Sequence, residues 1–238
     1  MLDCQYQKFF VRNLTKILKE GFVIKLLCRY WYYIGLGVAI IVGIILAFIW
    51  KDADVLVRVQ MLSFIAILLH QFEEYGFPGG EPAIMNKVLR GSDKPDRYPL
   101  NQFSAMLSNV LISYIVYVLP IVFPNVIWLG LAPILMGMMQ FIVHGILTNI
   151  KMKSLYNPGL GAVVLLHIPL GIFYINYITT NGLATANDWI FGVIYTILTV
   201  GFVLGALTYK ILPNENTKYI FSEKEMEKFN VFEKIGDK

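Results

Sequence analysis

The sequence has few charged residues and few cysteines, and each scarcity excludes a class of protein. Only 15% of its 238 residues are Asp, Glu, Lys or Arg, whereas soluble domains carry about 25%. The two cysteines, Cys4 and Cys28, are too far apart for a C-x-x-C site, so we expect free thiols. We find no internal repeat of fixed period, no Gly-rich phosphate loop and no nucleic-acid-binding module, so no nucleic-acid partner is expected. These features exclude an ordinary soluble globule, a disordered chain and a disulfide scaffold.

Long apolar runs take the place of the missing charge, and 57% of the residues are hydrophobic. Six segments each approach the roughly 20 residues that cross a bilayer. These segments are Trp31–Trp50, Val55–Phe77, Pro99–Phe123, Val126–Ile150, Pro158–Ile178 and Trp189–Leu212. The sequence therefore predicts an all-α fold, a polytopic bundle of six transmembrane helices that forms one membrane domain over residues 31–212.

The distribution of Lys and Arg predicts the orientation of this bundle. Six of these residues precede the first segment, four follow the second, two follow the fourth, and six follow or end the last. The opposite loops hold only Lys51, and Arg58 can snorkel outward from the end of its helix. Because basic loops remain in the cytoplasm, we predict a multi-pass protein of the cell membrane with both termini cytoplasmic.

Both ends of the chain lie outside the predicted membrane domain. Residues 1–30 are basic, and their apolar residues recur at helical spacing: Phe10, Leu14, Ile17 and Leu18. Such an amphipathic helix lies on an anionic membrane surface, and a partner-binding arm is the alternative. Residues 213–238 form a polar cytoplasmic tail, in which the capping box of Ser222 and Glu225 predicts the start of a short helix.

Ionisable residues inside the predicted membrane helices are few. All three histidines, His70, His144 and His167, lie in such helices, and Glu73 and Glu74 are exceptional among the acids in doing so. A charged side chain at the bilayer centre costs about 2.5–3.5 kcal/mol on insertion scales, so these residues indicate a function. At about 100° per residue, His70, Glu73 and Glu74 share one helical sector about 100° wide.

Four polar residues lie at similar depth in four different helices. His70, His144, His167 and Asn109 are six to ten residues from the predicted cytoplasmic ends of their helices. At about 1.5 Å per residue, this places them roughly 9–15 Å inside the membrane, so they can meet in one site near the cytoplasmic leaflet. The predicted catalytic residues are His70, Glu73, Glu74, Asn109 and Asn149.

Two chemistries fit these residues. In the first, a divalent metal ion, with Zn²⁺ as the first candidate, is bound by His70, Glu74, His144 and His167. The remaining Glu73 is then the general base for a metal-activated water. In the second, the two glutamates share a proton without a metal, one acting as acid and the other as base. Either version predicts a membrane enzyme, surrounded by lipids, that hydrolyses or isomerises a lipid or membrane-associated peptide.

Two other functions stay open on the sequence. A proton-coupled transporter also uses intramembrane carboxylates and histidines, but many transporters carry internal repeats, and a carrier needs a polar path that reaches both faces. A non-catalytic membrane protein, in which histidines hydrogen-bond between helices, leaves His70, Glu73 and Glu74 without a role.

The motif at residues 70–74 adds a resemblance to a known family. His70-Gln71-Phe72-Glu73-Glu74 spells H-x-x-E-E, and His144, Asn149 and a Y-N-P-G turn at residues 156–159 follow it. With these residues, the chain resembles the HXXEE-domain family of integral membrane proteins over about residues 60–210. The resemblance implies a membrane protein with an enzyme-like set of polar residues and names no reaction.

The same residues are also similar to the intramembrane CAAX-protease and bacteriocin-processing family. That family has the patterns E-E-x-x-x-R, F-x-x-x-H and H-x-x-x-N. Here Pro78 stands in the place of the Arg, Phe141 precedes His144 by three residues instead of four, and Gly171 follows His167 in the place of the Asn. These departures argue against direct membership and leave convergent chemistry open.

Overall fold

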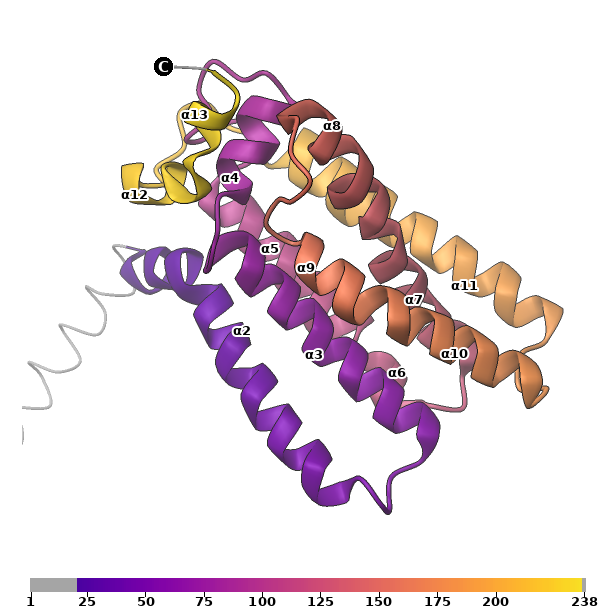
Figure 1. The fold of residues 1–238 in the computed structure, drawn as a ribbon. Helices are drawn as coiled ribbons and strands as arrows, with labels where there is room; N and C mark the ends of the chain where they lie inside the picture. Colours follow the sequence, from indigo (N-terminus) through magenta and orange to yellow (C-terminus); the bar gives the residue numbers. More distant parts are fainter. Residues whose placement is uncertain (1–20, 237–238) are drawn as a thin grey trace, which may run out of the picture.

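The computed structural model describes residues 21–236, and this part of the chain is helical without any β-strand (Figure 1). Six helical spans are long and apolar enough to cross a membrane. These spans are Phe22–Ile49, Val55–Tyr75, Gln102–Val122, Ile127–Met152, Leu160–Thr180 and Ala186–Ile211. The predicted all-α bundle with six membrane-spanning helices is confirmed.

The first two spans are single α-helices, α2 (Phe22–Ile49) and α3 (Val55–Tyr75). The other four contain π-helical segments, in which the wider turn shifts the direction of the side chains that follow. The third span consists of α5 (Gln102–Leu111), η2 (Ile112–Val116) and α6 (Leu119–Val122), and the fourth of α7 (Ile127–Gln140), η3 (Phe141–Thr148) and α8 (Asn149–Met152). The fifth consists of α9 (Leu160–Ala162), η4 (Val163–His167) and α10 (Ile168–Thr180), and the sixth of α11 (Ala186–Thr199) and η5 (Val200–Ile211).

Short helical turns lie at one end of the bundle, beside the basic loops. These are α4 (Glu81–Ala83), η1 (Ile84–Leu89), α12 (Glu223–Met226), η6 (Lys228–Asn230) and α13 (Val231–Lys234). We call this the basic end, formed by residues 76–101, 153–159 and 212–236. The opposite end consists of the short loops 50–54, 123–126 and 181–185.

The structure moves the start of the first span toward the N-terminus. Helix α2 begins at Phe22 instead of Trp31, after Gly21 with a φ of 64°. Lys25 and Arg29 interrupt the apolar run of the sequence, but neither residue stops a helix. The predicted amphipathic helix around Phe10 and Leu14 lies outside the described residues.

The tail forms short turns at the basic end instead of one helix. The predicted capping box of Ser222 and Glu225 opens α12. The helix then breaks, because Phe229 and Asn230 have φ angles of 60° and 51°. Apolar residues of the tail nevertheless pack against the ends of α2 and α3, and Met226 is buried there.

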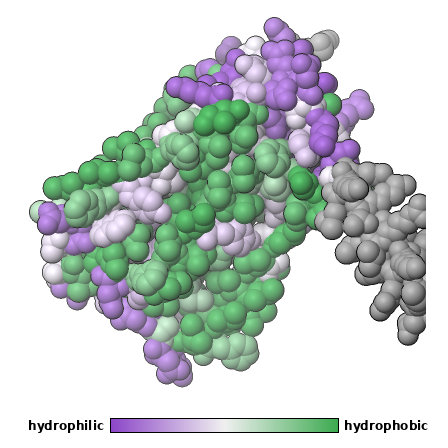
Figure 2. All heavy atoms as spheres, turned by 180° about the vertical axis from the view of Figure 1, so that it is seen from behind, coloured by the Kyte–Doolittle hydropathy of each residue, from purple (hydrophilic) through white to green (hydrophobic). Residues whose placement is uncertain are grey.

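The outer surface of the spans is apolar. Figure 2 shows hydrophobic side chains over most of the bundle and hydrophilic side chains gathered at its basic end, with a smaller group opposite. Helices α2 and α11 and segment η3 carry many exposed large hydrophobic residues. Such a surface needs a lipid environment, so the six apolar helices support a multi-pass membrane protein.

Helix α3 lies at the centre of the bundle. It packs against α2 on one side and against α9, η4, α6 and α10 on the others, and the largest share of buried residues among the six spans belongs to it. The helix that carries the H-x-x-E-E motif therefore faces protein on most of its circumference.

Candidate functional site

Three of the predicted residues meet in a buried cluster, which we call the trio: His70, Glu74 and His144. One carboxylate oxygen, Oε1 of Glu74, lies 3.3 Å from Nε2 of His70 and 3.3 Å from Nε2 of His144. The potential ligand atoms of the three residues all lie within 4.8 Å of one another. Their exposed fractions are 1%, 7% and 2%, so the trio is shielded from solvent.

The helices place these side chains by simple periodicity. His70 and Glu74 are four residues apart on α3, so they lie one above the other on the same face. His144 comes from η3 of the fourth span, and its ring centre is 5.0 Å from that of His70. Residues that bind or react recur in π-helical segments such as η3.

Hydrogen bonds fix which ring nitrogen of each histidine points at Glu74. Nδ1 of His70 lies 3.0 Å from the carbonyl oxygen of Gly159, which can only accept, so Nδ1 carries the hydrogen. Nδ1 of His144 lies 2.8 Å from Oδ1 of Asn157. The amide of Asn157 is oriented by its other atom, Nδ2, which donates to the carbonyl of His144 and to Oδ1 of Asn149, each at 2.7 Å.

In their neutral forms, both imidazoles therefore direct the Nε2 lone pair toward a carboxylate oxygen. Nε2 of His70 is buried and makes no hydrogen bond with any described residue, although Glu74 is close. Lone pairs and a negative charge repel one another unless a proton or a metal cation lies between them. The trio is thus a group of ligands that can hold a metal ion.

The turn before the fifth span brings its backbone against both histidines. Gly159 has a φ of 99°, and a Cβ atom there would lie 2.6 Å from Cε1 of His144 and 2.9 Å from Cε1 of His70. Only glycine accepts both the conformation and the contact. The sequence analysis used this Y-N-P-G turn for the family resemblance, but Asn157 and Gly159 were not among the predicted site residues.

His167 lies beside the trio and outside the group of ligand atoms that approach one another. Its ring centre is 5.5 Å from that of His70. The ring fits there because Gly137 has no side chain. A Cβ atom at residue 137 would lie only 2.4 Å from Nδ1 of His167. Nε2 of His167 is buried and has no hydrogen-bond partner among the described residues.

Glu73 points away from the trio and caps the start of the fifth span. Its Oε1 accepts from the backbone N–H of Gly161 at 3.0 Å and its Oε2 from that of Ala162 at 2.8 Å. The hydroxyl of Tyr156 donates to Oε1 at 2.8 Å, and burial raises the pKa of this phenol, so it stays a donor. The first N–H groups of a helix favour an anion, and Glu73 supplies it.

The two predicted asparagines are connected to the trio indirectly. Asn109 accepts a hydrogen bond from Gln71 at 3.1 Å and donates to the carbonyl of Ala105 at 2.9 Å. Asn149 accepts from Asn157, which in turn orients His144. Neither asparagine contacts the carboxylate of Glu74 through a hydrogen bond in the described part of the chain.

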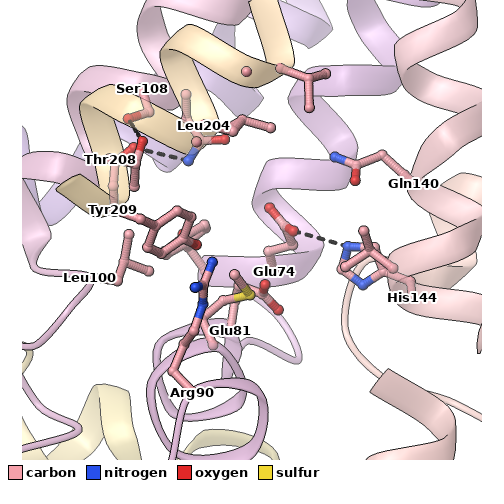
Figure 3. A pocket seen from close by; sticks show the side chains of 18 residues that line it. Glu74, Glu81, Arg90, Leu100, Ser108, Gln140, His144, Leu204, Thr208 and Tyr209 are labelled. Carbon is pink, nitrogen blue, oxygen red and sulfur yellow. Dashed lines mark hydrogen bonds and ion pairs between the residues drawn. The ribbon is translucent and has the colours of Figure 1, made fainter. Parts of the chain in front are cut away.

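A cavity of about 400 Å³ opens beside Glu74 and His144 (Figure 3). Its wall comes from α3, α4, η1, α5, η3 and η5, and Asn109 and Gln140 contribute amide groups to it. In the figure, Glu74, Glu81 and Arg90 surround the same space. Pockets of about 300–1,000 Å³ are typical of small-molecule sites.

Glu81 is a site residue that the sequence did not identify. It is only 4% exposed, it lines the cavity with Glu74, and its Oε2 makes no hydrogen bond with the described residues. Burial, together with the charge of Glu74, raises the pKa of Glu81 well above its usual range. Gly79 and Gly80 both have positive φ and turn the chain back to the bundle, and Pro82 and Ala83 bury the short helix α4 that follows. That apolar stretch after Glu81 was the available signal.

Comparison with known proteins gives one family. Residues 61–174 match the family model described as "Protein of unknown function with HXXEE motif". This segment contains the trio, Glu73, Glu81 and the turn at Gly159. No curated protein and no solved structure matches the chain.

Proposed function

We propose that the H-x-x-E-E motif, which lies in the segment that matches the HXXEE-motif family model, forms a metal centre here, in a membrane-embedded hydrolase that acts on a lipid or membrane-associated peptide. One observation carries the proposal. A single oxygen of Glu74 lies at the same distance, 3.3 Å, from Nε2 of His70 and Nε2 of His144. Ligands at about 2.0–2.1 Å from a tetrahedral Zn²⁺ are about 3.3–3.4 Å apart.

The composition of the trio also supports zinc. Two histidines and one glutamate form a known ligand set of catalytic zinc sites, which keep the fourth position for water or substrate. The partners of the two Nδ1 atoms, Gly159 and Asn157, give the rings the orientation that metal-ligating histidines need. His167 offers its unpartnered Nε2 next to this position.

Glu81 is the general base in this proposal, because Glu73 is occupied with the cap of α9. Burial and the negative charge of Glu74 raise the pKa of Glu81. A cation bound at Glu74 would offset the second cause and so favour the ionised form of Glu81, which is the base. Glu81 takes a proton from water, whose oxygen forms a bond to an ester carbonyl carbon. The carbon–oxygen bond to the leaving alcohol then breaks, and the proton passes to that alcohol.

The test is the metal content of detergent-purified protein and of matched variants. We expect about one zinc per chain in the wild type and none in Glu74→Gln or His144→Ala. Glu73→Gln is the control, because it makes the same change one residue away from the trio. Absence of bound metal from wild type that was purified without chelator and supplied with Zn²⁺ would refute the metal centre.

The same preparations test the reaction. Wild-type protein in vesicles of phospholipid is incubated, and the released products are identified by mass spectrometry. We expect turnover to stop with EDTA and to return with Zn²⁺, and Glu81→Gln to keep the metal while losing at least about a hundredfold in rate. Turnover that persists without metal would favour acid–base chemistry by the carboxylates alone.

A further inference from the structure

The cavity separates two spans that pack closely elsewhere. At the opposite end of the bundle, α7 and α11 are in direct contact, and a Cβ atom at Gly192 of α11 would lie 2.7 Å from Cβ of Leu131 of α7. Closer to the basic end, Val143 of η3 and Val200 of η5 both line the cavity. Gly201 lines it too, and a Cβ atom there would meet no atom within 4 Å. The fourth and sixth spans thus have open space between them next to the trio.

This space borders the lipid-facing surface of the bundle. Gly201, Phe202 and Gly205 of η5 are all exposed, and Gly201 and Gly205 belong to the cavity wall. Six apolar side chains also line that wall: Met85, Leu100, Ala105, Val143, Val200 and Leu204. An apolar chain can enter here from the membrane without crossing a polar barrier.

The other side of the cavity carries an arginine. Arg90 follows η1, and its guanidinium carbon lies 4.4 Å from the ring centre of Tyr209. Arg90 is exposed and makes no salt bridge within residues 21–236. Figure 3 shows its guanidinium directed into the cavity beside Glu81 and Tyr209. Its planar set of donors suits a phosphate or a carboxylate.

We propose that the cavity binds a lipid with an anionic headgroup, which enters from the membrane between the fourth and sixth spans. The acyl chain lies along η5, and Arg90 binds the phosphate or carboxylate of the headgroup. The bond between these two parts then lies next to Glu74 and His144, which line the cavity between its apolar and basic sides. The placement of that bond rests on the proposed hydrolase function, whereas binding of the lipid does not need the metal.

The experiment measures lipid binding to detergent-purified protein after treatment with EDTA, so that turnover does not consume the probe. The probes are radiolabelled palmitoyl lysophosphatidic acid, monopalmitoylglycerol and palmitate, which share an acyl chain and differ in the headgroup, the second being uncharged. Comparison of the first with the third distinguishes a phosphate from a carboxylate. Metal content is determined in parallel on protein that has not been treated with EDTA.

Two variants have matched controls in the same chain. Arg90→Gln removes the headgroup contact. Its control is Arg58→Gln at the opposite end of the bundle, because the guanidinium carbon of Arg58 also lies over an aromatic ring, 5.3 Å from the ring centre of Trp50. Gly201→Phe fills the cavity from η5. Its control is Gly37→Phe on α2, where an added Cβ likewise meets nothing within 4 Å.

We expect Arg90→Gln to bind an anionic probe at least about tenfold more weakly and to leave binding of the uncharged monopalmitoylglycerol unchanged. Gly201→Phe should weaken binding of every probe, and both controls should bind as the wild type does. Equal binding of charged and uncharged probes by wild type and Arg90→Gln would overturn the headgroup assignment.

Unaltered binding by Gly201→Phe would overturn the cavity as the lipid site. Binding of a Leu-rich membrane peptide in place of the lipids, with the same dependence on Gly201, would overturn the lipid in favour of a peptide. Loss of metal binding with intact lipid binding refutes the hydrolase and leaves the lipid site standing, so the two failures are distinguishable.

Discussion

Two adjacent carboxylates on α3 lie in contrasting surroundings. Glu74 faces two imidazole nitrogens and lines the cavity. Glu73 faces the start of α9, where two backbone N–H groups and the hydroxyl of Tyr156 occupy its oxygens. Neighbouring residues on a helix point about 100° apart, which is enough to put one acid in a structural cap and the other in a ligand group.

The difference lies in what the partners can donate. Around Glu73 each close partner is a hydrogen-bond donor, so the negative charge is satisfied by the protein alone. Around Glu74 the close partners are the Nε2 atoms of two histidines, and the Nδ1 atom of each ring makes its hydrogen bond to another residue. A carboxylate surrounded by donors holds a fold together, whereas one that faces two lone pairs needs a proton or a metal cation between them. Four substitutions test this distinction.

The largest effect is expected from Gly159→Ala, which acts on the two histidines of the trio and leaves the contacts of Glu73 unchanged. The new methyl group would overlap both imidazoles of the trio, and the positive φ of 99° adds strain. We expect loss of metal binding and a fall in stability of more than about 2 kcal/mol. Gly182→Ala is the control for a positive φ, because its φ of 62° also carries strain, although less than 99°, and nothing lies within 4 Å. Metal titration and thermal unfolding in detergent measure the two effects, and equal behaviour of the two variants would contradict the close contact.

Asn157→Ala should weaken metal binding without abolishing it. Asn157 contacts the ring of His144 at Nδ1 alone, so its loss frees the ring to rotate while every ligand atom remains. Removal of such a supporting hydrogen bond reduces metal affinity by about 10–100-fold. Asn157→Asp retains the acceptor but loses the donor to the His144 carbonyl and to Asn149, so it should recover part of the affinity in a competition titration with a chromophoric chelator. No difference between the two variants would show that His144 does not depend on this contact.

The sequence predicts more of the fold than of the site, and α3 shows why. Apolar length alone gives the six spans, and the common depth of His70 and His144 in two helices correctly predicts that they meet. Helical spacing cannot decide between Glu73 and Glu74, because it fixes the angle between them and leaves unknown which neighbour packs on each side. Glu81 lies in a loop of the sequence, where the apolar stretch after it is the one signal of its burial, and the turn at Gly79 and Gly80 returns it to the bundle.

Glu73→Ala should lower stability and leave the metal in place. The variant leaves two N–H groups at the start of α9 and the hydroxyl of Tyr156 without an acceptor. Hydrogen bonds to a charged group contribute about 1.5–3 kcal/mol, so thermal unfolding should occur at clearly lower temperature. Tyr156→Phe, which removes one of the three contacts, should lie between this variant and the wild type. Loss of stoichiometric zinc in Glu73→Ala, with the fold intact by circular dichroism, would return Glu73 to the ligand group.

The smallest effect is expected from Lys228→Met. This variant tests whether the C-terminal tail holds Glu74 in position or stabilises only the end of α3. Nζ of Lys228 donates to the carbonyl oxygens of Tyr75 and Gly76, at 2.6 and 3.0 Å, and so caps the helix directly after Glu74. Burial lowers the pKa of this amine, so part of the gain from the cap is offset by its desolvation. We expect a loss of about 0.5–1.5 kcal/mol in stability. Zinc affinity should change less than about threefold, because the hydrogen bonds that orient His70 and His144 come from the turn before the fifth span. A larger loss of affinity would show that the end of α3 moves with the tail and that Glu74 depends on that end for its position.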